Sequence, residues 1–142
     1  MYTGIQHLHS FLTYLVILGL ALSIIAALVG HFSGKPFTDR DRKLALTGLI
    51  PAHLQWMVGL LLYFFSPMGL SSLSGQAMSN SLLRLYTVEH PVMMILAVVL
   101  ITIGFARAKR LDDSKKQFLN IWVFYLIGLV FILSRIPWAA WP

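Results

Sequence analysis

Four long apolar segments constrain the fold of this chain more than any other feature. They lie at about residues 9–29, 44–65, 88–105 and 118–138, separated by polar or charged stretches. A helix of about 20 residues crosses the roughly 30 Å hydrocarbon core of a bilayer, and each segment is close to that length. Within lipid only helices and closed barrels leave no backbone group unpaired. The sequence therefore predicts four transmembrane helices, at about residues 5–32, 43–66, 81–108 and 117–138.

The composition supports an integral membrane protein. Of the 142 residues, 58% are hydrophobic and only 11% are charged, whereas about 25% of the residues in a typical soluble domain are charged. The lipid bilayer is therefore the expected partner of most of the surface. Because the connections are short, we expect a single domain, residues 1–142, folded as an all-α up-down bundle of four transmembrane helices. In such a bundle the first and third helices lie at diagonal corners.

The basic residues predict the orientation of the helices. Two loops hold nine of the eleven Lys and Arg residues: "GKPFTDRDRK", residues 34–43, and "RAKRLDDSKK", residues 107–116. Short loops rich in Lys and Arg face the cytoplasm. Both termini and the 67–87 loop are therefore expected on the outer, periplasmic side. This placement also explains the net charge of +6, so the charge requires no nucleic acid as a partner.

Several ionisable residues lie inside or at the edges of the predicted spans. His9 opens the first span, His53 lies in the middle of the second, and His90 lies near the outer start of the third. At a rise of about 1.5 Å per residue, His9 and His90 share the outer half of the membrane and His53 lies somewhat deeper. An ionisable residue within a span is by default a candidate for a functional site.

The three histidines predict a site for haem b. Neutral imidazole is a good axial ligand for iron, and helix bundles commonly hold cofactors between facing helices. His9 and His90 form the preferred ligand pair because their depths are similar. His53 is the alternative partner of His90, because it is better shielded from water.

Three charged residues complete the predicted haem site. Arg135 and Arg84 both lie on the outer side and are expected to bind the haem propionates. Glu89 is expected to orient an imidazole by accepting its hydrogen bond. The predicted function is electron transfer, either with a redox partner protein or as the haem-carrying subunit of a larger redox complex. Homo- and hetero-oligomers are both compatible with this prediction.

Other interpretations of the same residues stay open. His9, His53 and His90 could instead bind zinc or copper, with a nearby methionine as a soft copper ligand. The chain could also be a structural membrane subunit without a cofactor, because membrane histidines hydrogen-bond across helices. An enzyme or proton relay that uses His53 and Glu89 is a further alternative. The absence of cysteine excludes disulfides, thiolate metal sites and thiol catalysis.

Nearly the whole chain resembles a family of small four-helix bacterial membrane proteins labelled cytochrome b-like. The stretches that carry the resemblance are "MYTGIQHLHS", "KPFTDRDRKLAL", "AHLQWMVGLLLYFFSPMG", "EHPVMM", "VLITIGFARAKR" and "SRIPW". The resemblance implies a haem protein of the bacterial inner membrane. The layout is also loosely similar to one half of haem A synthase, whose halves use histidines near the outer side. That enzyme typically has arginine after its histidine, whereas Pro91 follows His90 here.

Overall fold

The computed structural model describes residues 1–142 and is helical throughout, with no β-strand. Four helices are long and apolar enough to cross a membrane, which confirms the predicted number of such segments. The helical elements are α1 (Tyr2–Ser33), α2 (Asp39–Phe65), the 3-10 turn η1 (Leu70–Ser72), α3 (Gly75–Ser79), α4 (Ser81–Arg84), the π turn η2 (Leu85–Glu89), α5 (His90–Arg110) and α6 (Ser114–Ser134).

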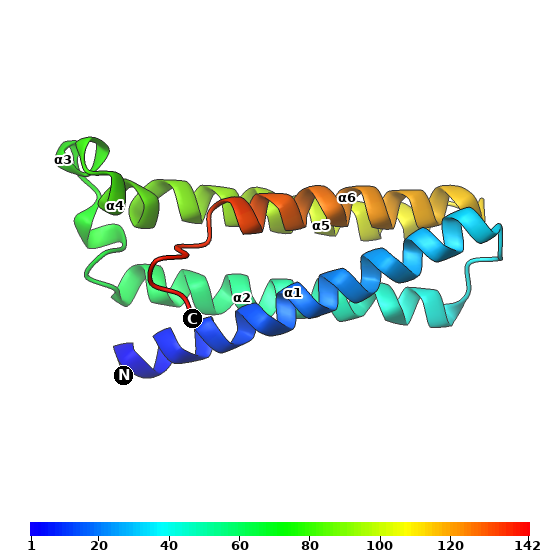
Figure 1. Ribbon diagram of the computed structural model, residues 1–142, viewed down its shortest axis with the longest axis horizontal. Helices are drawn as coiled ribbons and strands as arrows, with labels where there is room; N and C mark the ends of the chain where they lie inside the picture. The colour runs from blue at the N-terminus through cyan, green and yellow to red at the C-terminus, as the bar shows by residue number, and fades with distance from the viewer.

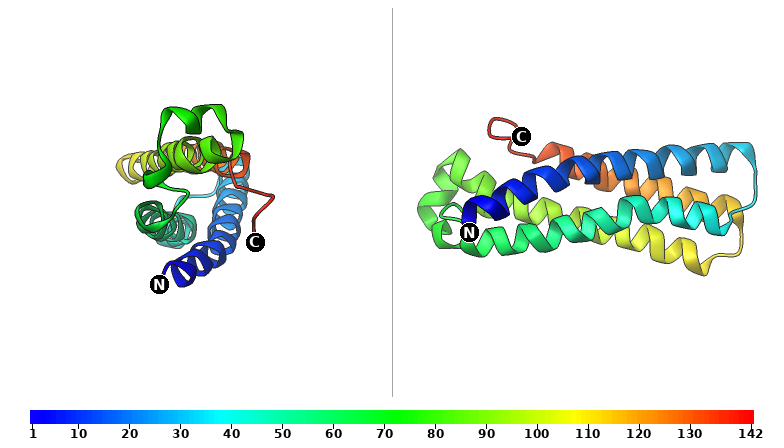
Figure 2. Two further views of the ribbon diagram at one scale, coloured as in Figure 1. Left: turned by 90° about the vertical axis from the view of Figure 1, so that its left-hand side faces the viewer. Right: turned by 90° about the horizontal axis from the view of Figure 1, so that it is seen from below.

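The long helices lie along one another as a bundle (Figure 1). Helix α1 packs against α2 and α6, and α5 packs against α6 and α2, so α1 and α5 occupy diagonal corners (Figure 2). Both termini and the short helices α3 and α4 lie at one end of the bundle (Figure 1). The α1–α2 and α5–α6 connections lie at the other end. These are the two loops that carry most of the basic residues.

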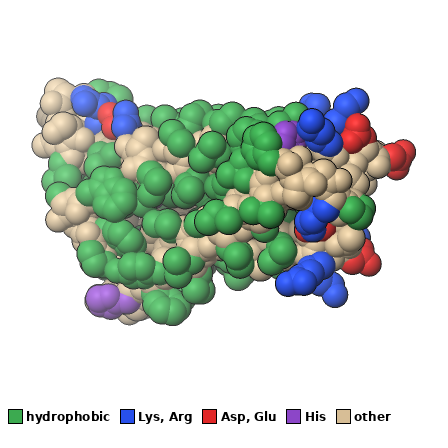
Figure 3. All heavy atoms as spheres, turned by 45° about the vertical axis from the view of Figure 1, so that its right-hand side comes forward, with side chains coloured by type: hydrophobic (Ala, Val, Ile, Leu, Met, Phe, Trp, Pro, Cys, Tyr) green, Lys and Arg blue, Asp and Glu red, His purple; other side chains and the backbone are tan.

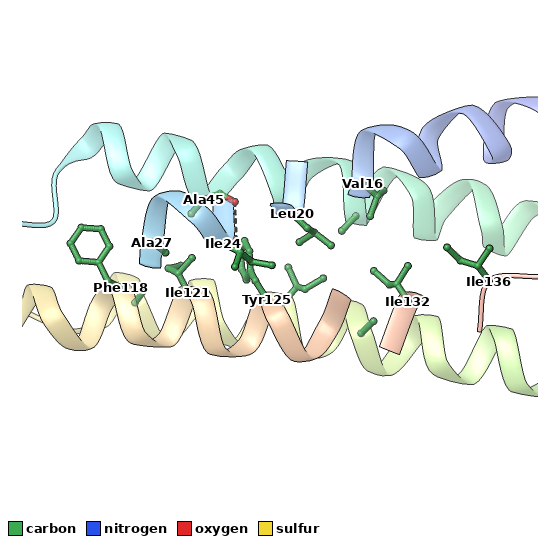
Figure 4. Close-up of a cluster of buried hydrophobic side chains, with 14 residues drawn as sticks. Val16, Leu20, Ile24, Ala27, Ala45, Phe118, Ile121, Tyr125, Ile132 and Ile136 are labelled. Carbon is green, nitrogen blue, oxygen red and sulfur yellow. Dashed lines mark hydrogen bonds between the residues drawn. The ribbon is translucent and has the colours of Figure 1, made fainter. Parts of the chain in front are cut away.

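The core of the bundle is narrow and built largely from aliphatic and small side chains. The side chains in Figure 4 come from all four long helices, most of them from α1 and α6, and the labelled ones are Val16, Leu20, Ile24, Ala27, Ala45, Phe118, Ile121, Tyr125, Ile132 and Ile136. The one hydroxyl in this cluster is satisfied across helices, because Tyr125 Oη donates a 2.8 Å hydrogen bond to the Ala45 carbonyl. The outer surface of the helices is hydrophobic over its middle, with most of the visible Lys and Arg at the right-hand end and a smaller charged group at the left-hand end (Figure 3).

Helices α1 and α2 approach each other closely where they cross. Pro51 lies inside α2 and has no N–H, so the Thr47 carbonyl lacks its usual partner four residues on. Gly19 of α1 lies directly against this carbonyl, and a Cβ at that position would run into it. Nearby, Ser23 Oγ donates a 2.7 Å hydrogen bond to the Leu44 carbonyl. Small and hydroxyl residues at such a crossing allow close backbone approach in an apolar environment.

Several helix ends differ from the predicted boundaries, most of all the start of α2, at Asp39 rather than near residue 43, and the end of α6. Helix α6 ends at Ser134 rather than near residue 138, because Pro137 disfavours helical geometry at the residue before it. Arg135 therefore follows the helix instead of lying on it. The start of the third span is interrupted by the π turn Leu85–Glu89 just ahead of Pro91. Asn80 caps α4, since its side chain accepts hydrogen bonds from the backbone of Leu82 and Leu83.

Candidate functional site

His9 of α1 and His90 of α5 meet between the diagonal helices at the end of the bundle that holds the termini. Their ring centroids are 6.2 Å apart and the ring planes are 80° apart. Both residues are half-buried, whereas His7, two residues before His9, is exposed. Residues two apart point to nearly opposite sides of a helix, so only one of this pair can face the interior.

A single backbone hydrogen bond orients the His90 ring. Its Nδ1 lies 2.7 Å from the carbonyl oxygen of Arg135. A carbonyl only accepts, so Nδ1 must carry the proton and Nε2 is left as the atom with a free lone pair. The Arg135 carbonyl is available because α6 has already ended at Ser134. The sequence-based expectation that Glu89 would orient an imidazole is therefore wrong for His90.

The surroundings of His9 include residues that the sequence analysis did not select. Gln55 of α2 donates hydrogen bonds from Nε2 to Thr13 Oγ1 at 2.8 Å and to the His9 carbonyl at 2.9 Å. The same nitrogen lies 3.5 Å from His9 Nε2. Gly59, one turn further along α2, leaves space for the ring, since a Cβ there would lie 2.9 Å from His9 Cε1. Gln55 and Gly59 therefore fix the position of His9.

Two polar atoms at this site are buried without a partner. His9 Nδ1 and Gln55 Oε1 make no hydrogen bond and are shielded from solvent. An unsatisfied buried polar group typically costs about 1–3 kcal/mol, and such groups in native proteins often mark a functional position. Together with the free Nε2 of His90, they give the site nitrogen and oxygen atoms that a bound group can engage.

His53 lies apart from the histidine pair. Its Nδ1 is 2.9 Å from the Leu49 carbonyl of its own helix, and its Nε2 is 3.2 Å from Thr102 Oγ1 on α5. Both ring nitrogens are therefore within hydrogen-bonding distance of a protein group. No group of three or more His, Cys, Asp or Glu residues gathers in an arrangement that could hold a metal ion. The structure thus does not bring together the three histidines selected for zinc or copper.

Glu89 bridges the two arginines selected from the sequence. Its Oε1 is 2.7 Å from Arg84 Nε, and its Oε2 is 3.3 Å from Arg135 Nε. Arg84 also donates a hydrogen bond to the Met78 carbonyl at 2.8 Å. Residues five apart do not face each other on a regular α-helix, but the π turn at Leu85–Glu89 widens the spacing and brings Arg84 beside Glu89.

Neither of two further cavities in the structure contains a histidine. Both lie toward the opposite end of the bundle, near the start of α2.

Comparison of the chain with protein-family models, curated proteins and solved structures finds no match. The resemblance to cytochrome b-like proteins stays a prediction, and the chemistry of the site is argued from its own residues.

Proposed function

We propose that this protein spans the bacterial inner membrane as an up-down four-helix bundle and binds haem b through His9 and His90. Its role is electron transfer, either with a redox partner protein or as the haem-carrying subunit of a larger complex. The observation that carries the proposal is the meeting of two imidazoles from diagonal helices, at the end of the bundle that holds no basic loop.

The separation of the two imidazoles is compatible with both of them binding one haem iron. Two imidazoles that each bind one metal ion at about 2 Å hold their ring centroids roughly 6 Å apart. The observed separation of 6.2 Å matches this value. The hydrogen bond from His90 Nδ1 to a backbone carbonyl is the usual support of a metal-bound imidazole, because it fixes the ring and its tautomer.

The number of histidines favours haem over a zinc site. A structural zinc ion needs four ligands and a catalytic zinc ion needs three protein ligands. Haem iron needs only two from the protein, since the macrocycle supplies the remaining four. His9 and His90 meet that smaller requirement, and His53 takes no part because both its nitrogens are engaged elsewhere. When bound, haem would supply a one-electron redox couple at this end of the bundle.

The charged residues at the same end suit the haem propionates. Arg135 is bound to Glu89 through Nε and to its own neighbour Ser134 through Nη1, which leaves its remaining donors for a second carboxylate. Arg84 makes an equivalent pair of contacts, with Glu89 and Met78, but its contact with Glu89 is shorter, 2.7 Å against 3.3 Å for Arg135. We therefore assign Arg135 as the principal propionate-binding residue.

The membrane orientation rests on the basic loops. The connections that hold nine of the eleven Lys and Arg residues lie together at one end of the bundle. The positive-inside rule makes that end cytoplasmic and puts the histidine pair near the periplasmic surface.

A comparison of histidine variants tests the proposal. The protein is purified in detergent, supplied with haem, and its Soret absorbance per mole of protein is measured. His9→Ala and His90→Ala are expected to lose most of the band or to shift it, whereas His53→Ala and His7→Ala keep it. A wild-type protein that stays colourless with added haem would overturn the proposal. A preparation that instead contains stoichiometric zinc or copper would support the metal-site alternative.

A further inference from the structure

The end of the bundle opposite the histidines holds a cavity that the haem proposal does not use. Its volume is about 240 Å³, and it lies between the start of α2, the end of α5 and the start of α6. Because a single buried water needs only about 10–15 Å³ of such space, the cavity has room for a larger group. Of the neighbouring helix pairs, α2 and α5 make the loosest contact, which accounts for an opening there.

The lining of the cavity is amphipathic. The apolar part consists of Phe37, Phe105, Ala108 and Ile121, of which the last two are fully buried. The polar part consists of the exposed residues Thr38, Asp39, Arg42 and Lys109, together with the half-buried Gln117. Gln117 ties α6 to α5 through a 3.0 Å hydrogen bond from Nε2 to the Ala108 carbonyl. A charged rim over an apolar floor is thus built from three helices.

The two cations on the rim have no acidic partner. The salt bridges of the chain join Lys35 to Asp41 and join two arginines to Glu89, so neither Arg42 nor Lys109 takes part in one. Lys109 makes a cation–π contact with the Phe105 ring, whose centroid lies 5.6 Å from Nζ. Asp39 is the single carboxylate on the rim, so two positive charges face one negative charge.

We propose that this cavity binds the phosphodiester headgroup of an anionic phospholipid in the inner leaflet. Arg42 and Lys109 pair with the phosphate, and the apolar floor receives the first carbons of an acyl chain. The inference rests on the membrane insertion and orientation proposed above. Insertion brings the rim to the level of the lipid headgroups, and the orientation makes these the headgroups of the inner leaflet. Basic pockets between transmembrane helices on the cytoplasmic side are a recurrent form of headgroup site.

The apolar floor favours a lipid over a soluble anion. Phe105 and Ile121 add nothing to the binding of free phosphate, which is fully hydrated in water. They do add contact area for a molecule whose charged group is joined to hydrocarbon. The hydrophobic side chains that cover the middle of the bundle lie next to the charged end, so an acyl chain can run along the surface from the cavity (Figure 3).

Native mass spectrometry of the detergent-purified full chain tests this site. The wild-type protein is titrated with phosphatidylglycerol and, separately, with phosphatidylcholine, and the lipid-bound fraction is compared. Arg42→Gln with Lys109→Gln is the test variant. Arg40→Gln with Arg110→Gln is the matched control. It removes the same charge from the same two helix ends, at exposed residues that do not line the cavity. Circular dichroism verifies that both variants keep their helices.

The expected result is a preference of the wild type and the control for phosphatidylglycerol. The test variant should bind this lipid about five-fold more weakly for each cation removed, given roughly 1 kcal/mol per basic residue at an anionic surface. Equal losses in the two double variants, or equal binding of both lipids by the wild type, would overturn the proposal. Displacement of the lipid by millimolar inorganic phosphate would also overturn it, because the site would then recognise a free anion.

Failure of this inference is separable from failure of the proposed function. Haem absorbance reports only on the opposite end of the bundle, and neither double variant should change it. If carbonate washing removed the protein from membranes, membrane insertion itself would be contradicted. A chain that stays in the membrane and binds haem but shows no lipid preference contradicts only the lipid site.

Discussion

Replacing Gly59 by alanine should displace His9, the proposed haem ligand, by steric contact alone. A Cβ at Gly59 would lie 2.9 Å from His9 Cε1. Carbon atoms in ordinary contact are about 3.5–4.0 Å apart, so the ring must move by roughly 0.6 Å or more. Metal sites tolerate about 0.2 Å in a ligand distance, which is a smaller displacement. Gly59→Ala should therefore weaken or break the bond from His9.

A matched variant separates this effect from general overpacking. At Gly128 a Cβ would lie 2.8 Å from Ile101 Cγ1, a clash of the same size in the core away from the histidines. Each substitution should destabilise the bundle by about 1–3 kcal/mol, as overpacking usually does. Only Gly59→Ala should also change the haem environment, because only that glycine faces His9.

Thermal unfolding and visible spectra of the two haem-loaded variants give the test. Both should melt at lower temperature than the wild type, and only Gly59→Ala should lose the spectrum of six-coordinate, low-spin haem. A Gly128→Ala protein whose spectrum changes as much as that of Gly59→Ala would contradict a specific effect on His9. So would a Gly59→Ala protein that loses stability but keeps the wild-type spectrum.

Three further predictions concern the core, the charged residues and the orientation. Tyr125→Phe should cost about 0.5–1.5 kcal/mol of stability, because it removes the buried hydrogen bond to Ala45; denaturant titration in detergent checks this, and no loss would contradict it. Arg135→Ala should lower haem retention more than Arg84→Ala, since Arg135 lies beside His90 and has the longer contact with Glu89, 3.3 Å against 2.7 Å for Arg84; equal retention would contradict the assignment. Reporter fusions at Pro142 should be active only as periplasmic reporters, and cytoplasmic activity there would contradict the orientation.

The long helices could be read from the sequence because length and hydropathy decide them. Four apolar segments of about 20 residues have no other arrangement that pairs their backbone groups in lipid. The predicted end of α6 lay about four residues too far along the chain, although Pro137 is the residue that prevents the helix from continuing.

The details of the site were harder to predict because they depend on tertiary contacts. Nothing in the sequence indicates that the Arg135 carbonyl faces His90, since that contact joins residues 45 positions apart. The pairing of Arg84 with Glu89 depends on a π turn, whereas pair rules for regular helices favour spacings of three or four. Gln55 was missed because only ionisable residues were weighed, although a glutamine inside an apolar span is itself a signal.

Electron paramagnetic resonance of the oxidised, haem-loaded protein tests the central claim most directly, because the spin state of ferric haem reports the number of strong axial ligands. Two imidazoles should give a low-spin signal in the wild type, and it should persist in His53→Ala. His9→Ala and His90→Ala should each convert it to a high-spin signal as one ligand is lost. A wild-type protein that gives only a high-spin signal, or a low-spin signal that survives both of these substitutions, would contradict ligation by His9 and His90.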